Sequence, residues 1–515
     1  MSLHDLGSVN PERGFTLTSL SVIEWSDSSQ ADAQRVGVEA GRVGAPQSVA
    51  SPGACRGEPM PVCFRPDELT GDWREFWDDL DAEGKALDAR LLARVVFPTL
   101  DRYDLPALAS HLELTLPRDD AAARAATAGE ALRKTLAALQ AIPLGALTEM
   151  ERILKPMDHP LGRLVSQAAS EAVRRGFGAK NRSLTDLLPA GLQAGARRRP
   201  EPRNPSLPLD DEAICGLFGQ DGLLARNHKS YEHRPEQIRM VREVCHAFND
   251  GLVLMVEAGT GTGKSMAYLA PAATWAMRND DPVVVSTNTK NLQSQLMTND
   301  LPLLTSSLGK GLRYALIKGR SNYLCLRKFL MTLRDADREL SDRDRLQILP
   351  LIAWLAGTKS GDVAACGGFE PGMASDLWRR VSTRPEECAG NQCRWFRRCF
   401  VRRARAVAAQ SDIIIANHAA VFSDCAAPNP VLPEHRGIIF DEAHNIEDVI
   451  TNCLQIEVRP GQAGRILGRL CATARGRACS PPCASTSRGS AIRLPEALRR
   501  RWESGSPESS ARSTS

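Results

Sequence analysis

The sequence predicts an α/β fold, in which a parallel sheet is wound on both faces by helices, carries a cysteine-bearing insertion and follows a mainly helical segment. Four short aliphatic runs have the length and composition of buried parallel strands, and helical stretches lie between them. The runs are Leu252–Val256, Val283–Val285, Ile413–Ile415 and Ile438–Phe440. Strands that alternate with helices are typical of doubly wound sheets.

Length and charge set broad limits. A chain of 515 residues is too long for one compact core and predicts two or three folded units. The formal net charge is only +4, because 65 Lys and Arg are nearly balanced by 61 Asp and Glu. The bulk charge therefore indicates no particular partner, and only local charge can do so.

The 14 cysteines are spread along the chain, and residues 1–10 are polar. No apolar run approaches the length of about 20 residues that spans a bilayer. We therefore expect no membrane association and a location in the reducing cytoplasm, where clustered cysteines bind metal more often than they form disulfides. Most thiols, including Cys215 and Cys245, are interpreted as ordinary buried residues.

Composition divides the chain before the sheet. Residues 1–66 are rich in Ser, Gly, Ala and Pro and are expected to be flexible, with no assigned function. Residues 67–195, the helical segment, are rich in Ala and Leu. Two apolar faces recur there at helical spacing: Leu91, Leu92, Val95 and Val96, then Leu132, Leu136 and Leu139. Residues 196–212 are rich in Arg and Pro and predict a linker.

The α/β part is predicted to span residues 213–458, with the insertion at about 319–405. Residues 459–515 are rich in Arg, Ser, Ala and Gly and are expected to be disordered or foreign to the fold.

A glycine-rich run follows the first predicted strand. It reads Glu257, Ala258, Gly259, Thr260, Gly261, Thr262, Gly263, Lys264, Ser265. A turn of this kind that opens a helix directs backbone N–H groups at phosphate, and this predicts a P-loop. Lys264 would reach the β- and γ-phosphates and Ser265 would bind Mg²⁺. Ala258 departs from the strict pattern, which has Gly there, and the alternative is a glycine-rich surface turn.

An acidic pair follows the last predicted strand. A carboxylate at the end of a buried strand can hold Mg²⁺ opposite a P-loop, and a second one can position the attacking water. We assign the metal to Asp441 and the water to Glu442. His444 either couples nucleotide state to another site or caps a turn. The alternative for the whole string is a solvated helix start.

Several motifs in order resemble a known family. They are Arg234–Gln237, Ser286–Leu296, Lys318–Cys325, Asp412–His418 and Asp441–Asn445. The segment from Tyr231 to Val449 resembles superfamily 2 iron–sulfur DNA helicases of the DinG/XPD group. The resemblance implies a RecA-like motor lobe that hydrolyses ATP, with Gln237 on the adenine side. It also implies 5′→3′ translocation on single-stranded DNA and unwinding of forked DNA.

The resemblance also implies a second motor lobe with an arginine finger. No motif after Val449 matches that lobe. We therefore expect a truncated or frameshifted product, able to bind nucleotide but poor at unwinding.

Four cysteines lie between the P-loop and the acidic pair: Cys325, Cys388, Cys393 and Cys399. Four thiolates that converge on one point are what a [4Fe–4S] cluster requires, and the family resemblance favours that cluster. The alternatives are zinc, whose paired ligands are usually closer in sequence, and unligated buried thiols. Cys366 is the main rival for a ligand position.

A basic and aromatic stretch surrounds these cysteines. It comprises Arg379, Arg380, Arg384, Arg394, Trp395, Phe396, Arg397, Arg398, Arg402, Arg403 and Arg405. Arginines neutralise phosphates and aromatic rings stack on unpaired bases, which predicts a place where duplex DNA is split. The alternative is a solvated helix with its aromatics toward the cluster, and we favour this alternative slightly for Trp395 and Phe396.

Part of the helical segment resembles the C-terminal half of a DEDD-type 3′–5′ exonuclease, at residues 95–100 and 103–109. Such enzymes need several carboxylates for two metal ions. The last motif's His and Asp would fall near Arg118 and Ala123, and no early Asp-x-Glu pair precedes them. We expect a degenerate remnant without nuclease activity, and an unrelated helical domain stays open.

Two other functions stay open. One is a DNA-binding or redox-sensing protein that uses the cluster without motor activity. The other is a P-loop ATPase that acts on a protein or a small molecule. Stimulation of ATP hydrolysis by single-stranded DNA distinguishes a motor from both.

Overall fold

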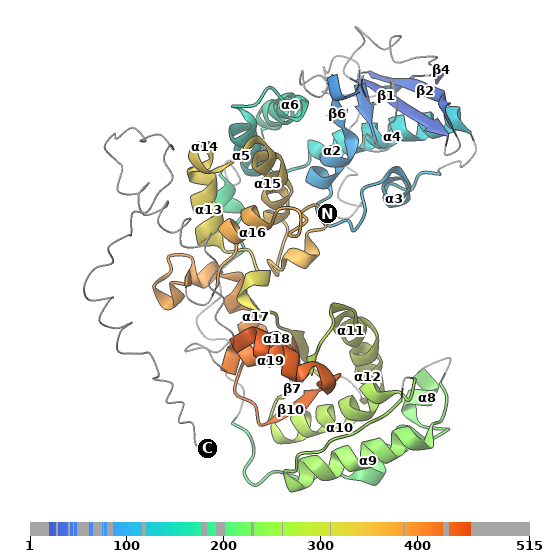
Figure 1. The fold of residues 1–515 in the computed structure, drawn as a ribbon, viewed down its shortest axis with the longest axis vertical. Helices are drawn as coiled ribbons and strands as arrows, with labels where there is room; N and C mark the ends of the chain where they lie inside the picture. Colours follow the sequence, from blue (N-terminus) through green and yellow to red (C-terminus); the bar gives the residue numbers. More distant parts are fainter. Residues whose placement is uncertain are drawn as a thin grey trace, which may run out of the picture. The chain divides into compact units, whose positions relative to one another are not determined.

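The computed structural model describes most of the chain up to Leu454 (Figure 1). The described residues are 20–26, 29–39, 42–44, 46–48, 61–64, 75, 77–79, 86–115, 120–176, 183–191, 201–227, 231–259, 261–308, 311–384, 387–425 and 432–454. All of them belong to one compact unit, Met1–Leu454. The predicted tail, residues 459–515, lies outside the described residues. None of the described helices is long and apolar enough to cross a membrane.

A parallel sheet of four strands forms the centre of the α/β part. Its order is β10 (Gly437–Phe440), β7 (Val283–Thr287), β9 (Ile413–Asn417) and β8 (Tyr314–Leu316). Every neighbouring pair is parallel. The aliphatic side chains of β7 and β9 are fully buried, which confirms the predicted buried strands there. β10 confirms the last strand but not its burial, since Ile438 is 38% exposed. These strands make a parallel α/β sheet with helices between them along the chain.

The predicted first strand, Leu252–Val256, is wrong. Gly251 ends α9 (Pro235–Asp250) in a left-handed conformation, and the residues after it form no strand. Val253 is 96% and Met255 93% exposed. A strand needs a neighbour to bond its backbone, and no described strand pairs with the outer edge of β10. The aliphatic composition of this run predicted that it would be buried, but no described neighbour covers it.

A second sheet lies within the first part of the chain. It has the order β3 (Arg42–Val43), β2 (Ser29–Glu39), β1 (Leu20–Ser26), β5 (Pro61–Cys63) and β6 (Leu87–Asp88), and β4 (Gln47–Ser48) also pairs with β2. β1 and β2 form an antiparallel hairpin, whereas β5 runs parallel to β1. The structure therefore has strands where we expected residues 1–66 to be flexible. Pairing between strands of the same chain organises this segment, although its local composition does not predict strands.

The helical segment contains the predicted helices. They are α2 (Ala89–Val96), α3 (Leu105–His111), α4 (Ala121–Leu139), α5 (Leu144–Leu154) and α6 (Pro160–Arg174). Asp88, Asp104 and Asp120 cap the first helical N–H groups of α2, α3 and α4. The apolar faces predicted on α2 and α4 point into the core, with Leu92, Leu132 and Leu139 fully buried. α4 also lies against β1 and β2 (Figure 1).

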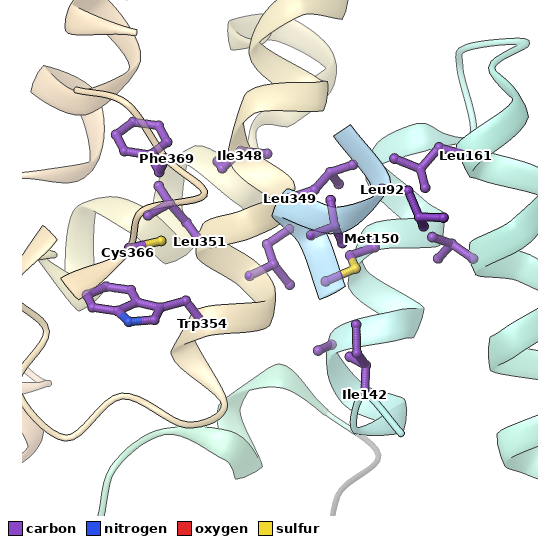
Figure 2. Packing of buried hydrophobic residues seen from close by; sticks show 14 of the residues in the cluster. Leu92, Ile142, Met150, Leu161, Ile348, Leu349, Leu351, Trp354, Cys366 and Phe369 are labelled. Carbon is purple, nitrogen blue, oxygen red and sulfur yellow. The ribbon is translucent and has the colours of Figure 1, made fainter. Parts of the chain in front are cut away.

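The insertion is also helical. It contains α13 (Leu326–Arg334), α14 (Ala336–Glu339), α15 (Asp342–Leu355), α16 (Ser375–Val381) and α17 (Phe400–Ala408). Its buried side chains belong to the same hydrophobic cluster as those of the helical segment. Figure 2 shows Ile348 and Leu349 of α15 beside Leu92 and Met150 of the helical segment. The sequence predicted two separate domains here, and the structure joins their cores.

Residues 201–210 of the predicted linker lie against the α/β part. The side-chain amide of Asn279 bonds both the N–H and the carbonyl of Leu207, at 2.7 and 3.1 Å. Asn249 does the same for Leu209, at 2.6 and 3.1 Å. These amides satisfy backbone groups of an irregular segment. This part of the linker is thus anchored in the structure.

Candidate nucleotide-binding site

The glycine-rich turn opens α10 (Lys264–Asn279). Gly261 and Gly263 have φ of +79° and +75°, a region that side chains with a Cβ disfavour. The hydroxyl of Thr262 donates to the Gly259 carbonyl at 3.0 Å. The ammonium of Lys264 donates to the Ala258 carbonyl at 3.0 Å, so the loop folds around its own lysine. Thr260 lies outside the described residues.

Gln237 holds this turn from α9. Its side chain is buried, and its amide nitrogen donates to the Gly263 carbonyl at 2.9 Å. A Cβ added to Gly263 would lie 2.2 Å from that nitrogen. Position 263 therefore needs Gly for its conformation and for the approach of Gln237. The expected contact with adenine stays a prediction, because in this structure the amide nitrogen bonds the turn itself.

The acidic pair begins where β10 ends. The backbone N–H of Asp441 donates to the Ser286 carbonyl of β7 at 2.8 Å. The phenol of Tyr268, on α10, donates to the carboxylate of Asp441 at 2.8 Å. Burial, followed by the Asp441 charge, raises the pKa of Tyr268 well above its usual value, so the phenol keeps its proton. Asp441 is thus bonded to the helix that Lys264 begins.

The two residues after Asp441 have different surroundings. Glu442 has φ of +57°, unusual for a residue with a side chain, and its N–H donates to the Asp441 carboxylate at 2.9 Å. His444 is exposed, and its Nε2 lies 2.9 Å from the Asn445 amide nitrogen. Asp441 and Glu442 therefore lie at the strand end, and His444 faces the surface.

Three residues near this site were missed by the sequence reasoning. Tyr268 is one turn after Lys264, so its i+4 spacing on the same helix face was an available signal. His418 shares a 2.7 Å hydrogen bond with the Ser286 hydroxyl, and burial lowers its pKa. Asp300 ends a π-helical turn, and burial raises its pKa, whereas hydrogen bonds from Gln295 and Ser265 lower it. His418 ends the motif Asp412–His418, although the sequence reasoning gave it no role, and nothing local distinguished Asp300.

A pocket lies beyond the carboxyl ends of β8 and β9. Its lining includes Lys318, Arg320, Asn322, Asn417 and Asp424. Two of the motifs that carry the family resemblance, 318–325 and 412–418, therefore meet here. In open α/β sheets ligands bind at this edge.

The four candidate ligand cysteines lie in one neighbourhood of the insertion. Cys325 and Cys399 are the N-cap residues of α13 and α17. Burial raises the pKa of both thiols, and backbone N–H groups of the following helical turn oppose that shift. Charges on Cys388 and Cys393 further raise the pKa of Cys399. Among the described residues, however, no three His, Cys, Asp or Glu side chains converge tightly enough to hold a metal ion.

Cys366, the rival for a ligand position, lies elsewhere. Its side chain is fully buried beside Trp354 and Phe369 (Figure 2). Burial raises its pKa to about 12. Cys388, by contrast, acts electrostatically on Cys399, which makes Cys388 the better candidate.

The basic stretch is partly engaged within the chain. Arg394 lies over Trp395 at 4.9 Å and Arg402 over Phe396 at 4.1 Å. Trp395 also packs against the hydrophobic core of the insertion and the helical segment. Arg379 and Arg380 pair with Asp376 and Asp344 of the insertion, and two further contacts join the stretch to the helical segment. Arg398 and Arg403 donate to the carbonyls of Thr185 and Ala190, at 3.2 and 2.7 Å.

The parallel sheet, the glycine-rich turn and the strand-end acids together are consistent with the nucleotide-binding fold of P-loop helicases. The family model DEAD_2 matches residues 389–462, which include the acidic pair.

Curated relatives with similar sequences carry the names of DinG-type helicases. The chain is 40% identical over 257 residues to "ATP-dependent helicase DinG" of Mycobacterium tuberculosis, covering 46% of this chain and 38% of the relative. It is 36% identical over 236 residues to "ATP-dependent DNA helicase YoaA" of Escherichia coli, covering 45% of this chain and 36% of the relative. These matches confirm the resemblance that the motifs indicated.

A third relative matches more of the chain. "3'-5' exonuclease DinG" of Bacillus subtilis is 30% identical over 376 residues, covering 70% of this chain and 38% of the relative. A match of this extent includes part of the helical segment. This chain therefore spans well under half of the length of the curated relatives that it matches.

Proposed function

We propose that this chain binds and hydrolyses Mg²⁺–ATP as the first lobe, residues 213–458, of a DinG-type DNA helicase. The hydrogen bond between Tyr268 and Asp441 carries the proposal, because it joins the P-loop helix to the strand-end acid. A P-loop and an acidic strand end must face each other to hold a metal-bound triphosphate. Translocation in the 5′→3′ direction on single-stranded DNA, and unwinding of forked DNA, follow the relatives as part of this proposal.

Each site residue has a chemical task in this mechanism. The N–H groups from Gly259 to Ser265 cradle the phosphates, and Lys264 leaves the Ala258 carbonyl to neutralise them. The hydroxyl of Ser265 and the carboxylate of Asp441 hold Mg²⁺, which supplies charge to the triphosphate oxygens. Glu442 orients the attacking water. His444, at the surface, couples nucleotide state to DNA.

We include a [4Fe–4S] cluster on Cys325, Cys388, Cys393 and Cys399. The donor set fits, since thiolates are the ligands of such clusters and two of these thiols accept N–H groups at helix N-termini. The guanidinium of Arg320 also donates to the Cys388 sulfur at 3.5 Å. Such a cluster supplies structural cross-linking and one-electron chemistry.

The other parts of the proposal concern DNA and the helical segment. Arginines of the insertion neutralise DNA phosphates where they are not bonded within the chain. The helical segment is a nuclease-like remnant without nuclease activity, because the carboxylates that hold two metal ions are missing from its last motif. The whole chain has 14 cysteines, none of them expected in a disulfide, and this fits a cytoplasmic protein.

ATP hydrolysis tests the central claim. Purified chain should hydrolyse ATP faster with single-stranded DNA, and Lys264→Ala should abolish turnover while the exposed Lys155→Ala should not. Turnover that ignores DNA would favour an ATPase with another target. No turnover and no Mg²⁺-dependent nucleotide binding by the unaltered chain would remove the proposal.

Iron content tests the cluster separately. Anaerobically purified protein should be brown with about four irons per chain. Cys393→Ser should lose the iron, whereas Cys453→Ser, a cysteine of α19 (Ile446–Leu454), should keep it. A colourless protein with one zinc ion would reject the cluster and leave the ATPase result untouched.

A further inference from the structure

Helix α15 is buried around most of its circumference. Eight of its 14 residues are buried: Arg345, Ile348, Leu349, Pro350, Leu351, Ile352, Trp354 and Leu355. A helix that is buried on most sides needs neighbours on most sides. Figure 2 shows those neighbours: Phe369 and Cys366 of the insertion lie on one side, and Leu92 and Met150 of the helical segment on the other. The insertion alone supplies only part of this enclosure.

A buried charge fixes the same contact. Arg345 is 4% exposed, and its guanidinium donates to the Ile153 carbonyl of α5 at 2.7 Å and to the Ala336 carbonyl at 3.2 Å. In return, Arg152 of α5 donates to the Leu333 carbonyl of α13 at 2.6 Å. Arg345 also pairs with the Asp337 carboxylate of the insertion at 3.1 Å, and the helical segment supplies the remaining acceptor, the Ile153 carbonyl.

Two consecutive glycines let the backbones touch. The N–H of Gly368 donates to the Pro98 carbonyl at 3.1 Å. A Cβ on Gly367 would lie 1.8 Å from the Leu100 carbonyl oxygen, and one on Gly368 would lie 2.6 Å from that of Arg94. Contacts this close are backbone to backbone, so no side chain can turn aside to relieve them. The sequence at 367–368 is therefore fitted to the helical segment.

A second contact reaches the cysteines. Arg398 and Arg403, which flank Cys399, donate to the carbonyls of Thr185 and Ala190. The end of the helical segment thus holds both sides of one candidate cluster ligand. Neither contact belongs to the nucleotide site.

We propose that the helical segment and the insertion are one folding unit, in which the helical segment is the obligate structural support of the cysteine-bearing turns. The enclosed α15, the buried Arg345 and the glycine pair each require the helical segment to be present. The role goes beyond the proposed motor function and holds whether or not the chain hydrolyses ATP.

Cleavage of the full chain tests the unit directly. A protease site inserted between residues 192 and 200 separates the helical segment from the rest in sequence only. After cleavage, the two fragments should co-elute in gel filtration at 1 M salt, since a closed apolar contact does not weaken with screening. Fragments that separate while both stay soluble would overturn the proposal.

Hydrogen exchange of variants tests the fit. Gly367→Ala should raise amide exchange roughly tenfold or more in peptides from both 89–172 and 323–401, with β7 and β9 unchanged. Gly372→Ala is the matched control, because its Cβ would meet no atom within 4 Å. Faster exchange on one side alone, or in neither, would show two independent domains. If Gly367→Ala does not accumulate as soluble protein, the cleavage result decides alone.

Discussion

The hydrophobic core shared by the helical segment and the insertion differs sharply in its solvent exposure from the α/β part around the glycine-rich turn. The first is closed: Leu92, Met150 and Leu349 have no exposed surface. The second keeps an open strand edge at β10 and an aliphatic run, Leu252–Val256, that faces solvent. One region derives its stability from apolar contacts between distant segments, whereas the other presents polar groups for a ligand. The largest losses of stability are therefore expected from substitutions in the first region, and smaller ones from substitutions in the second.

The largest expected effect is in the shared core. Leu349→Ala should lower the free energy of unfolding by about 2–5 kcal/mol, because it leaves a cavity among residues that cannot collapse onto it. Met255→Ala removes a side chain of similar size from a residue that is 93% exposed. This substitution should change the free energy of unfolding by less than about 0.5 kcal/mol. Urea unfolding of both variants measures the difference. Equal losses would show that the contrast between the two regions does not exist.

A smaller effect is expected at the acidic strand end. Tyr268→Phe removes the donor to Asp441 and should lower the free energy of unfolding by about 0.5–1.5 kcal/mol. Affinity for Mg²⁺–nucleotide should not fall, since the freed carboxylate can still bind the cation. Tyr314→Phe, on β8, is the matched control. Calorimetric titration decides, and a lost affinity would make Tyr268 a positioning residue of the site.

The smallest expected effect depends on pH. Burial lowers the pKa of His111, whose ring packs edge-on against Phe97 in the helical segment. The unfolded chain then binds the proton more tightly, so stability is constant above the ordinary pKa of about 6.5 and falls as pH drops through the lower folded value. Thermal unfolding should show a smaller acid loss in His111→Gln than in the unaltered chain. His246→Gln, at a half-exposed histidine, should not reduce that loss.

The sequence predicted elements better than it predicted their partners. The strands predicted at 283–285 and 413–415 and the apolar faces of the helical segment follow from local patterns, and the P-loop and acid motifs follow from spacing. Leu252–Val256 has the composition of a buried strand, but pairing is a property of the neighbour and not of the run. The contact of Arg345 with Ile153 joins residues 192 positions apart, and no local pattern encodes such a distance.

Parts of the site were equally hidden. The two halves of the nucleotide site were expected to meet, and the link through Tyr268 agrees with that expectation without testing the assigned roles. The arginines near Cys399 were counted as DNA ligands by charge. Two of them instead satisfy carbonyl groups of the helical segment, which only the folded chain reveals.

The backbone at Glu442 has an evolutionary consequence. With φ of +57°, this residue occupies a conformation that costs a non-glycine side chain about 1–2 kcal/mol. Glycine would relieve that strain and make the fold more robust, yet it would delete the acid. Selection for stability alone would therefore favour replacement of Glu442. The glutamate thus marks a position where the proposed activity and the stability of the fold compete.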